Sequence, residues 1–153
     1  PKPAVAPNNV FLVHGHDHGS LETVARFLEK LGLDVTILHE KPNRGQTIIE
    51  KLERESDVDL AVVLLTPDDV GSTVDDQENL SPRARQNVVM ELGLFIGKLG
   101  RDRTFALVKG AIEKPSDYHG VLYIPFGPKY PWKVALAKEL KEAGANIDLN
   151  DAL

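Results

Sequence analysis

Leu60-Ala61-Val62-Val63-Leu64-Leu65 is an unbroken run of six apolar residues in a chain of 153 residues. A strand with one wet face alternates apolar and polar side chains, whereas a parallel strand covered on both faces is apolar throughout. The run therefore predicts a central strand of a parallel sheet. Four other short β-rich runs fit the same sheet, at residues 10–13, 35–38, 104–108 and 121–124.

Helical patterns separate these runs. Thr47-Ile48-Ile49-Glu50 has the form of a capping box, and Leu52 continues the apolar side of the helix that it opens. Ser81-Pro82 is typical of an N-cap followed by proline at the first helical position, for a helix that ends at Gly100. Periodic apolar residues predict two further helices, over residues 21–31 and 132–143.

This order of elements predicts one α/β domain. We expect a three-layer, flavodoxin-like sandwich with a mainly parallel five-stranded sheet and helices on both faces. The domain spans residues 9–153, and the Pro- and Ala-rich residues 1–8 are expected to be a linker or tail, left where a domain was cut from a longer protein. In such folds ligands bind beyond the carboxyl ends of the strands, where this sequence is unusually polar.

The composition disfavours several classes of function. A net charge of −5 argues against nucleic acid as a partner, because binding a phosphate backbone needs a basic surface. No apolar run approaches the roughly 20 residues of a membrane span, and the composition of the first residues leads us to expect no signal peptide there. The absence of cysteine excludes disulfides and thiolate chemistry, so we expect a cytoplasmic protein.

Glu91 is the main candidate for chemistry. The helix before Gly100 is apolar nearly all round, which predicts burial on several sides, and Asn87 lies one turn before Glu91. A carboxylate in apolar surroundings is costly unless it is paired or its pKa rises, so such a group is a candidate for function. The alternative is a structural glutamate bonded to a loop amide or to Arg85 or Arg101.

His14-Gly15-His16-Asp17-His18 follows the first strand. Three alternating histidines suggest a metal, but no other His or Cys cluster completes a ligand set, so no metal is expected. We favour contacts of His14, His16 and Asp17 with a ligand, with Gly15 letting the backbone approach. The alternative is a turn in which Asp17 or Ser20 caps the first helix.

Later strand ends add weaker candidates for substrate binding. Lys41 and Arg44 could neutralise a diphosphate, although a solvated loop is the simplest interpretation of that stretch. Thr66 and Asp68 follow the central strand at the same edge. Residues 70–81 are expected to form a surface loop, or a lid, in front of the helix that carries Glu91.

These motifs resemble the conserved boxes of TIR (Toll/interleukin-1 receptor-like) domains. Residues 10–17 resemble the first box, residues 45–52 the end of the BB loop and its helix, and residues 60–72 the third strand and its continuation. Residues 85–101 closely resemble the Arg-Gln-Asn-Val-x-x-Glu-Leu-Gly-x-x-x-Gly-Lys-Leu-Gly-Arg pattern of a bacterial TIR-like group predicted to bind nucleotides. The likeness spans roughly residues 8–153.

The resemblance implies an activity and a biological setting. Members of this group are antiphage effectors triggered by cyclic nucleotides, and many consume NAD⁺. Asn87-Val88-Val89-Met90-Glu91 stands in the place of the family's Trp-Cys-x-x-Glu motif, without its Trp and Cys, which puts Glu91 on the catalytic glutamate. The loop after the second strand also lacks the family's usual Arg-Asp pair and Pro-Gly. The resemblance implies self-association through TIR–TIR contacts and a cyclic-nucleotide-responsive sensor domain outside this sequence.

The implied reaction is hydrolysis of NAD⁺ at the nicotinamide–ribose bond, with NAD⁺ as substrate and no cofactor. Cleavage passes through an oxocarbenium-like cation, and nicotinamide leaves as a neutral molecule, so no general acid is needed. Glu91 would stabilise the cation, Asn87 would orient it or the ribose, and Arg44 would face the phosphates.

Three other functions fit parts of the sequence. Glu91-Leu92-Gly93 matches a Glu-x-Gly motif of nucleoside deoxyribosyltransferases, which would leave NAD⁺ untouched. A response-regulator receiver would use Asp17, Asp68 and Lys109, but the chain lacks the adjacent acidic pair of receivers at its first strand. A TIR scaffold that only binds nucleotides or self-associates is the non-enzymatic alternative.

Overall fold

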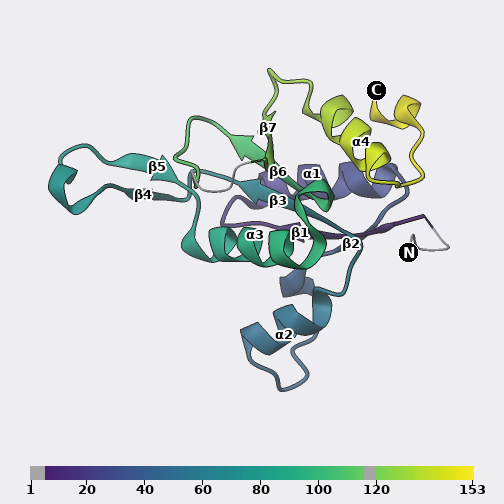
Figure 1. Cartoon of the computed structure of the whole chain (residues 1–153), viewed down its shortest axis with the longest axis horizontal. Helices are drawn as coiled ribbons and strands as arrows, with labels where there is room; N and C mark the ends of the chain where they lie inside the picture. The colour runs from purple at the N-terminus through teal and green to yellow at the C-terminus, as the bar shows by residue number, and fades with distance from the viewer. Residues whose placement is uncertain (1–5, 116–119) are drawn as a thin grey trace.

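The computed structural model describes residues 6–115 and 120–153 (Figure 1). Five parallel strands form one sheet in the order β2-β1-β3-β6-β7. Their bounds are β1 Asn9–Val13, β2 Asp34–Thr36, β3 Leu60–Leu65, β6 Thr104–Lys109 and β7 Leu122–Phe126. The predicted α/β sandwich with a parallel five-stranded sheet is confirmed.

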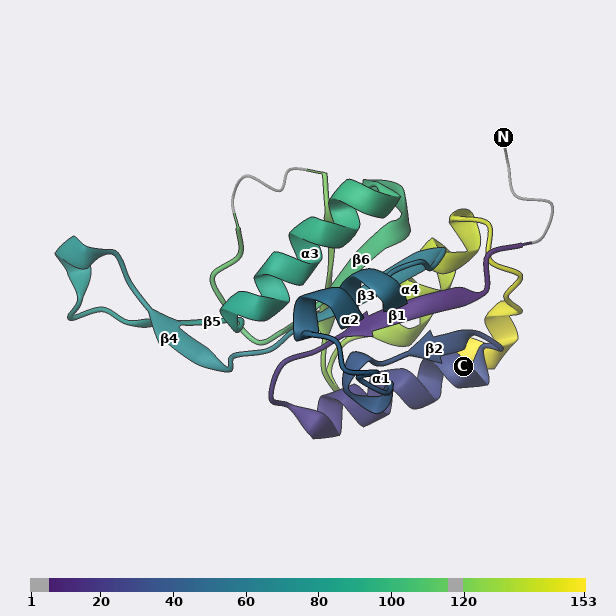
Figure 2. The same cartoon turned by 90° about the horizontal axis from the view of Figure 1, so that it is seen from below.

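The two faces of the sheet are covered by different helices (Figures 1 and 2). Helices α1 (His18–Lys30) and α4 (Trp132–Glu142) lie on one face, and α2 (Ile48–Glu55) and α3 (Gln86–Leu99) on the other. Alternate residues of β3 enter the two cores, as the period of a strand requires: Val62 faces α1 and α4, and Val63 faces α3. In the described part of the chain, no helix combines the length and apolar character needed to cross a bilayer.

The first strand begins beside residues that were expected to belong to the linker. Residues 1–5 of that segment lie outside the described ranges. Pro7 is buried, and the carbonyl oxygen of Asn8 accepts a hydrogen bond of 2.8 Å from the amide of Asp34. Pro7 and Asn8, which precede β1, therefore already contact the rest of the domain.

The prediction that Ser81-Pro82 opens the third helix is wrong. Strand β5 (Ser81–Arg83) pairs antiparallel with β4 (Asp69–Gly71), and Pro82 lies opposite Val70. A two-stranded ribbon tolerates proline because its outer edge needs no amide donor. Helix α3 starts only at Gln86, with Arg85 at its N-cap. The expected loop 70–81 is thus a hairpin, closed by a short 3₁₀ turn at Val74–Asp76, and it projects away from the body of the domain (Figure 1).

The second strand is shorter than predicted, because the chain leaves the sheet at Thr36 and forms a 3₁₀ turn over Leu38–Glu40. The capping box of α2 is confirmed: Glu50 N donates to Thr47 Oγ1 at 3.2 Å, and Thr47 N donates to Glu50 Oε1 at 3.1 Å. Leu52 is buried as expected.

Helix α3 packs on the sheet with one face only. Val88, Leu92 and Phe95 are buried, and the ring of Phe95 lies 4.8 Å from that of Phe11 between centroids. Met90 on the outer side is 49% exposed. Burial of this helix on several sides, which its apolar composition predicted, is therefore wrong.

Replacing Phe95 by alanine is expected to lower the free energy of unfolding by about 3–5 kcal/mol, because it opens a cavity beside Phe11 in a fully buried position. Met90→Ala, on the exposed side of the same helix, is the matched control and should change stability by less than about 1 kcal/mol. Urea denaturation followed by circular dichroism measures both. Equal losses would contradict the one-sided packing of α3.

Candidate functional site

A cavity of about 430 Å³ opens where β1 ends, between α2 and α3. Strand β1 pairs with β2 on one side and β3 on the other, so the chain order reverses at this point. In open α/β sheets such a reversal is the place where ligands bind. The cavity is lined by Phe11, Leu12, Val13, His14, Leu38, His39, Asn43, Gln46, Ile48, Lys51, Arg85, Asn87, Val88 and Glu91.

Glu91 enters this cavity from α3. The neighbouring Val88 and Leu92 are buried against the sheet, and this orientation turns Glu91 and Asn87 toward the cavity. Burial raises the pKa of the Glu91 carboxyl to about 7, and the nearby charge of Arg85 opposes that rise. The carboxyl group is therefore partly protonated near neutral pH, as a carboxyl in a poorly solvated site should be.

Two cations line the same cavity, and they are not the ones that the sequence suggested. Lys51 of α2 is 6% exposed, and Arg85 precedes α3. Lys41 and Arg44, which were expected to face phosphates, are not among the lining residues, and Arg44 is exposed in the left-handed region with φ of 53°. The sequence offered little signal for Lys51, since it stands beside Leu52 in a charged helix.

The loop after β1 is braced by an ion pair. Lys109 Nζ lies 2.5 Å from Asp17 Oδ2 and 3.1 Å from Ser20 Oγ. Asp17 is also the N-cap of α1, accepting from Ser20 N at 3.0 Å, which confirms the alternative that Asp17 caps the first helix. The hydrogen bond from Lys109, aided by the bond from the Ser20 amide, lowers the pKa of Asp17 to about 2.

A second brace joins the loops after β1 and β3. Asp68 accepts hydrogen bonds from His16 N at 3.1 Å and from Thr66 Oγ1 at 2.9 Å. A Cβ atom at Gly15 would overlap the Asp68 carboxylate, so this close approach needs glycine. Five residues that were predicted to bind substrate therefore contact other parts of the protein and do not line the cavity. They are Gly15, His16, Asp17, Thr66 and Asp68.

His14 is the predicted histidine that reaches the cavity. Its Nδ1 lies 2.8 Å from the carbonyl oxygen of Gly15, which can only accept, so Nδ1 carries a proton. Its Nε2 lies 3.0 Å from Nδ1 of His39, and the ring of His18 packs near both. Among the described residues, no group of three or more His, Cys, Asp or Glu is arranged to hold a metal ion.

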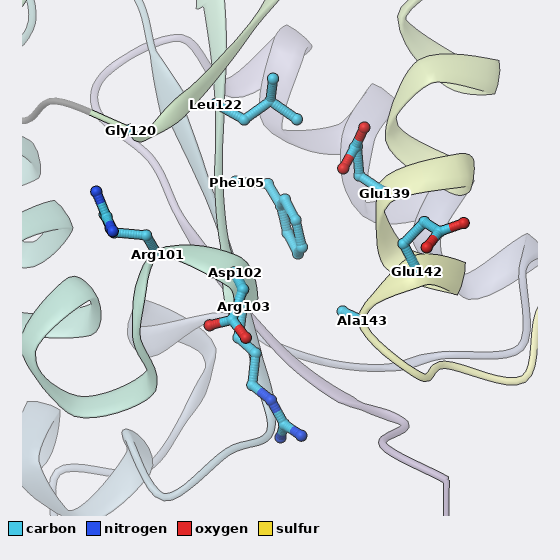
Figure 3. Close-up of a pocket in the computed structure, with 9 residues that line it drawn as sticks. All are labelled: Arg101, Asp102, Arg103, Phe105, Gly120, Leu122, Glu139, Glu142 and Ala143. Carbon is cyan, nitrogen blue, oxygen red and sulfur yellow. The ribbon is translucent and has the colours of Figure 1, made fainter.

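A larger hollow of about 620 Å³ lies at the opposite edge of the sheet, beside the first residues of β6 and β7 (Figure 3). Glu139 and Glu142 project from α4 on one side, and Arg101 and Arg103 diverge on the other. None of the residues predicted for the site lines it. We therefore place the candidate site at the smaller cavity, which combines a perturbed carboxyl with buried charge.

Comparison with known proteins gives consistent matches. Residues 9–127 match the family model of the CAP12/Pycsar effector protein TIR domain. The Escherichia coli (strain K12) "Uncharacterized protein YuaY" is 50% identical over 157 residues, covering 100% of this chain and 52% of that protein. Dictyostelium discoideum "Protein tirC" is 40% identical over 129 residues, covering 76% and 63%. The chain thus spans between half and two thirds of these relatives' lengths.

A relative with a more specific name matches over a shorter region. The Xanthomonas perforans "Pycsar effector protein XpPycTIR" is 40% identical over 85 residues, covering 54% of this chain and 27% of that protein. Among solved structures, a 2-deoxyribosyltransferase of Bacillus psychrosaccharolyticus covers 94% of this chain and 95% of its own, at 14% identity and a TM-score of 0.47. A likeness this distant carries no argument about function.

Replacing Glu91 by glutamine is expected to stabilise the domain above neutral pH. A carboxyl whose folded pKa is raised contributes stability below its unfolded pKa near 4.5 and loses it as pH rises through about 7. The advantage of Glu91→Gln should therefore grow between pH 4.5 and 8. It should reach on the order of 2 kcal/mol, since one pKa unit is worth about 1.4 kcal/mol and partial exposure reduces the cost.

Thermal melts of both proteins at pH 5 and pH 8 measure this difference. Glu29→Gln, which removes an exposed carboxylate of α1, is the matched control and should show no such trend. A melting difference for Glu91→Gln that is the same at both pH values would show that Glu91 is ordinarily solvated or paired.

Proposed function

The chain belongs to the CAP12/Pycsar effector TIR-domain family, and from this membership and the charges of the cavity we propose that it hydrolyses NAD⁺ at the nicotinamide–ribose bond. The observation that carries the proposal is the carboxyl of Glu91, held in a cavity that also contains Lys51 and Arg85. NAD⁺ has a positive charge at the nicotinamide and negative charges on its diphosphate. A cavity with charges of both signs complements such a molecule.

Glu91 is proposed to act on the ribose carbon that bears nicotinamide. As the carbon–nitrogen bond breaks, its electron pair leaves with nicotinamide and positive charge develops on the ribose. A carboxylate removed from water stabilises this charge more strongly than a solvated one, because little water screens it. Water then adds to the cation and releases a proton to the solvent, which gives ADP-ribose. The pyridinium of the bound substrate also favours the ionised form of Glu91.

Other residues that line the cavity are suited to positioning Glu91 or the substrate. Asn87 lies one turn before Glu91 on α3 and can donate to the Glu91 carboxylate or to a ribose hydroxyl. His14 stands at the end of β1, and its contact with His39 fixes the ring at the cavity wall. Asp17 and Asp68 act indirectly in this proposal, because their bonds hold the loop that presents His14.

We place the reaction in an antiphage effector that is activated by self-association. The relatives named Pycsar effector proteins are longer than this chain, which covers 27% of the Xanthomonas perforans protein, so a cyclic-nucleotide sensor domain elsewhere in the full protein is part of the proposal. Ile48, which lines the cavity, and the next residue Ile49 are 75% and 51% exposed, and this apolar surface suits contact with a second TIR domain. A cytoplasmic location fits the substrate and the lack of cysteine.

Release of nicotinamide from NAD⁺ tests the proposal, measured by chromatography at high protein concentration and with artificially clustered protein. Wild type should release nicotinamide, and Glu91→Gln should lose at least about 100-fold in kcat/KM, because the charge that stabilises the cation is gone. Glu29→Gln should behave as wild type. Near-normal turnover by folded Glu91→Gln would remove Glu91 from the mechanism.

Two outcomes would favour the alternatives. No nicotinamide release from clustered wild-type protein would point to a TIR scaffold without catalysis. Base exchange on deoxynucleosides, with NAD⁺ left intact, would point to a deoxyribosyltransferase.

A further inference from the structure

Lys51 is a buried cation in the wall of the cavity that holds Glu91. Lys51 is 6% exposed, whereas Ile48 and Ile49 of the same helix are 75% and 51% exposed. An amphipathic helix normally turns its apolar side inward, so α2 is inverted at these positions. Burying a lysine opposes folding, and two exposed isoleucines contribute little of the stabilisation that their burial would give. Residues that break the folding pattern in this way are concentrated at functional sites.

The Lys51 ammonium group has no protein partner within the described ranges. It forms no hydrogen bond or ion pair there. Glu91 is the only carboxylate among the described lining residues, and it lies beyond ion-pair distance from Lys51. The cation that acts on the Glu91 carboxyl is instead Arg85. Lys51 and the partly buried carboxyl of Glu91 thus line one cavity without forming an ion pair with each other.

The backbone around Lys51 is held in place from both sides. The Thr47–Glu50 capping box fixes the start of α2, and Leu52 anchors the helix in the core. Arg54 Nη2 donates to the carbonyl oxygen of Pro42 at 2.6 Å, and its Nη1 donates to Gln46. These bonds tie the loop at the cavity mouth to the helix that carries Lys51. The backbone that carries Lys51 is therefore fixed before any ligand arrives.

We infer that Lys51 is the anion-binding group of this cavity and that it selects ligands with a nucleoside diphosphate over the corresponding nucleosides. The inference rests on the proposed function, since a substrate with its ribose at Glu91 extends its diphosphate away from that carboxylate. An ammonium group suits phosphate oxygens as a compact point charge with three donors. Arg85 influences the charge of the Glu91 carboxyl, whereas Lys51 forms no ion pair within the described ranges, so Lys51 is the cation that we assign to the diphosphate.

Calorimetric titration with ADP and with adenosine at pH 7.5 tests the inference without any catalysis. Wild type should bind ADP at least tenfold more tightly than adenosine. Lys51→Met keeps most of the side-chain volume and removes the charge, so it should lose this preference and keep its affinity for adenosine. Lys51→Arg should retain most of the preference. Lys141→Met removes an exposed lysine of α4 and should match wild type.

A thermal melt separates binding from structure. Without ligand, Lys51→Met should melt at or above the wild-type temperature, because it replaces a largely buried lysine, which has no ion pair among the described residues, by an apolar side chain. A fall of several degrees would reveal a structural partner and overturn the inference. Three results of the titration would overturn the inference as well. Lys51→Met could bind ADP as tightly as wild type does, it could lose ADP and adenosine binding equally, or wild type could fail to bind ADP.

The failure of this inference can be distinguished from the failure of the proposed reaction, because the titration measures binding and nicotinamide release measures catalysis. If ADP binding depends on Lys51 but wild type releases no nicotinamide, the inference stands and the hydrolase proposal fails. If nicotinamide release depends on Glu91 but the affinity for ADP does not depend on Lys51, the hydrolase proposal stands and the inference fails.

Discussion

A carboxyl group held away from water must either keep its proton or find a positive charge, and the cavity at the end of β1 is organised around this constraint. Arg85 supplies part of the needed charge to Glu91, yet burial still holds the pKa near 7. In the same cavity Lys51 is a cation that forms no ion pair with any residue that the structure describes. The ligand that we propose has a cationic and an anionic part, which would interact with Glu91 and Lys51 respectively and stabilise the folded domain when bound.

The sheet makes this arrangement possible. Parallel strands deliver all their following loops to one edge, and the reversal of strand order beside β1 leaves a gap between α2 and α3. The polar residues at that edge have two different structural roles. Asp17 with Lys109, and Asp68 with His16, brace the loops, while His14 reaches the cavity from the braced loop. Loss of a brace would act on the site through the position of His14.

Sequence reasoning succeeded where one local rule controlled the outcome. The unbroken apolar run of β3 and the capping box at Thr47 each express a single strong constraint. The raised pKa of Glu91 agrees with a carboxylate in apolar surroundings, and its catalytic role stays a prediction. Sequence reasoning failed where two rules competed. Ser81-Pro82 suits an N-cap, but pairing with β4 prevails, and the isoleucines of α2 suggest an inward face that the structure gives to Lys51. The role of Lys51 could not be predicted, because it depends on residues that only the fold brings together.

The pH dependence of nicotinamide release from NAD⁺ by clustered wild-type protein tests the central role of Glu91 most directly. The ionised carboxylate is the form that stabilises a ribosyl cation, so kcat/KM should rise with pH through an apparent pKa near 7 and then level off. A rate that stays constant from pH 5.5 to 9, or falls as pH rises through 7, would contradict catalysis by the Glu91 carboxylate.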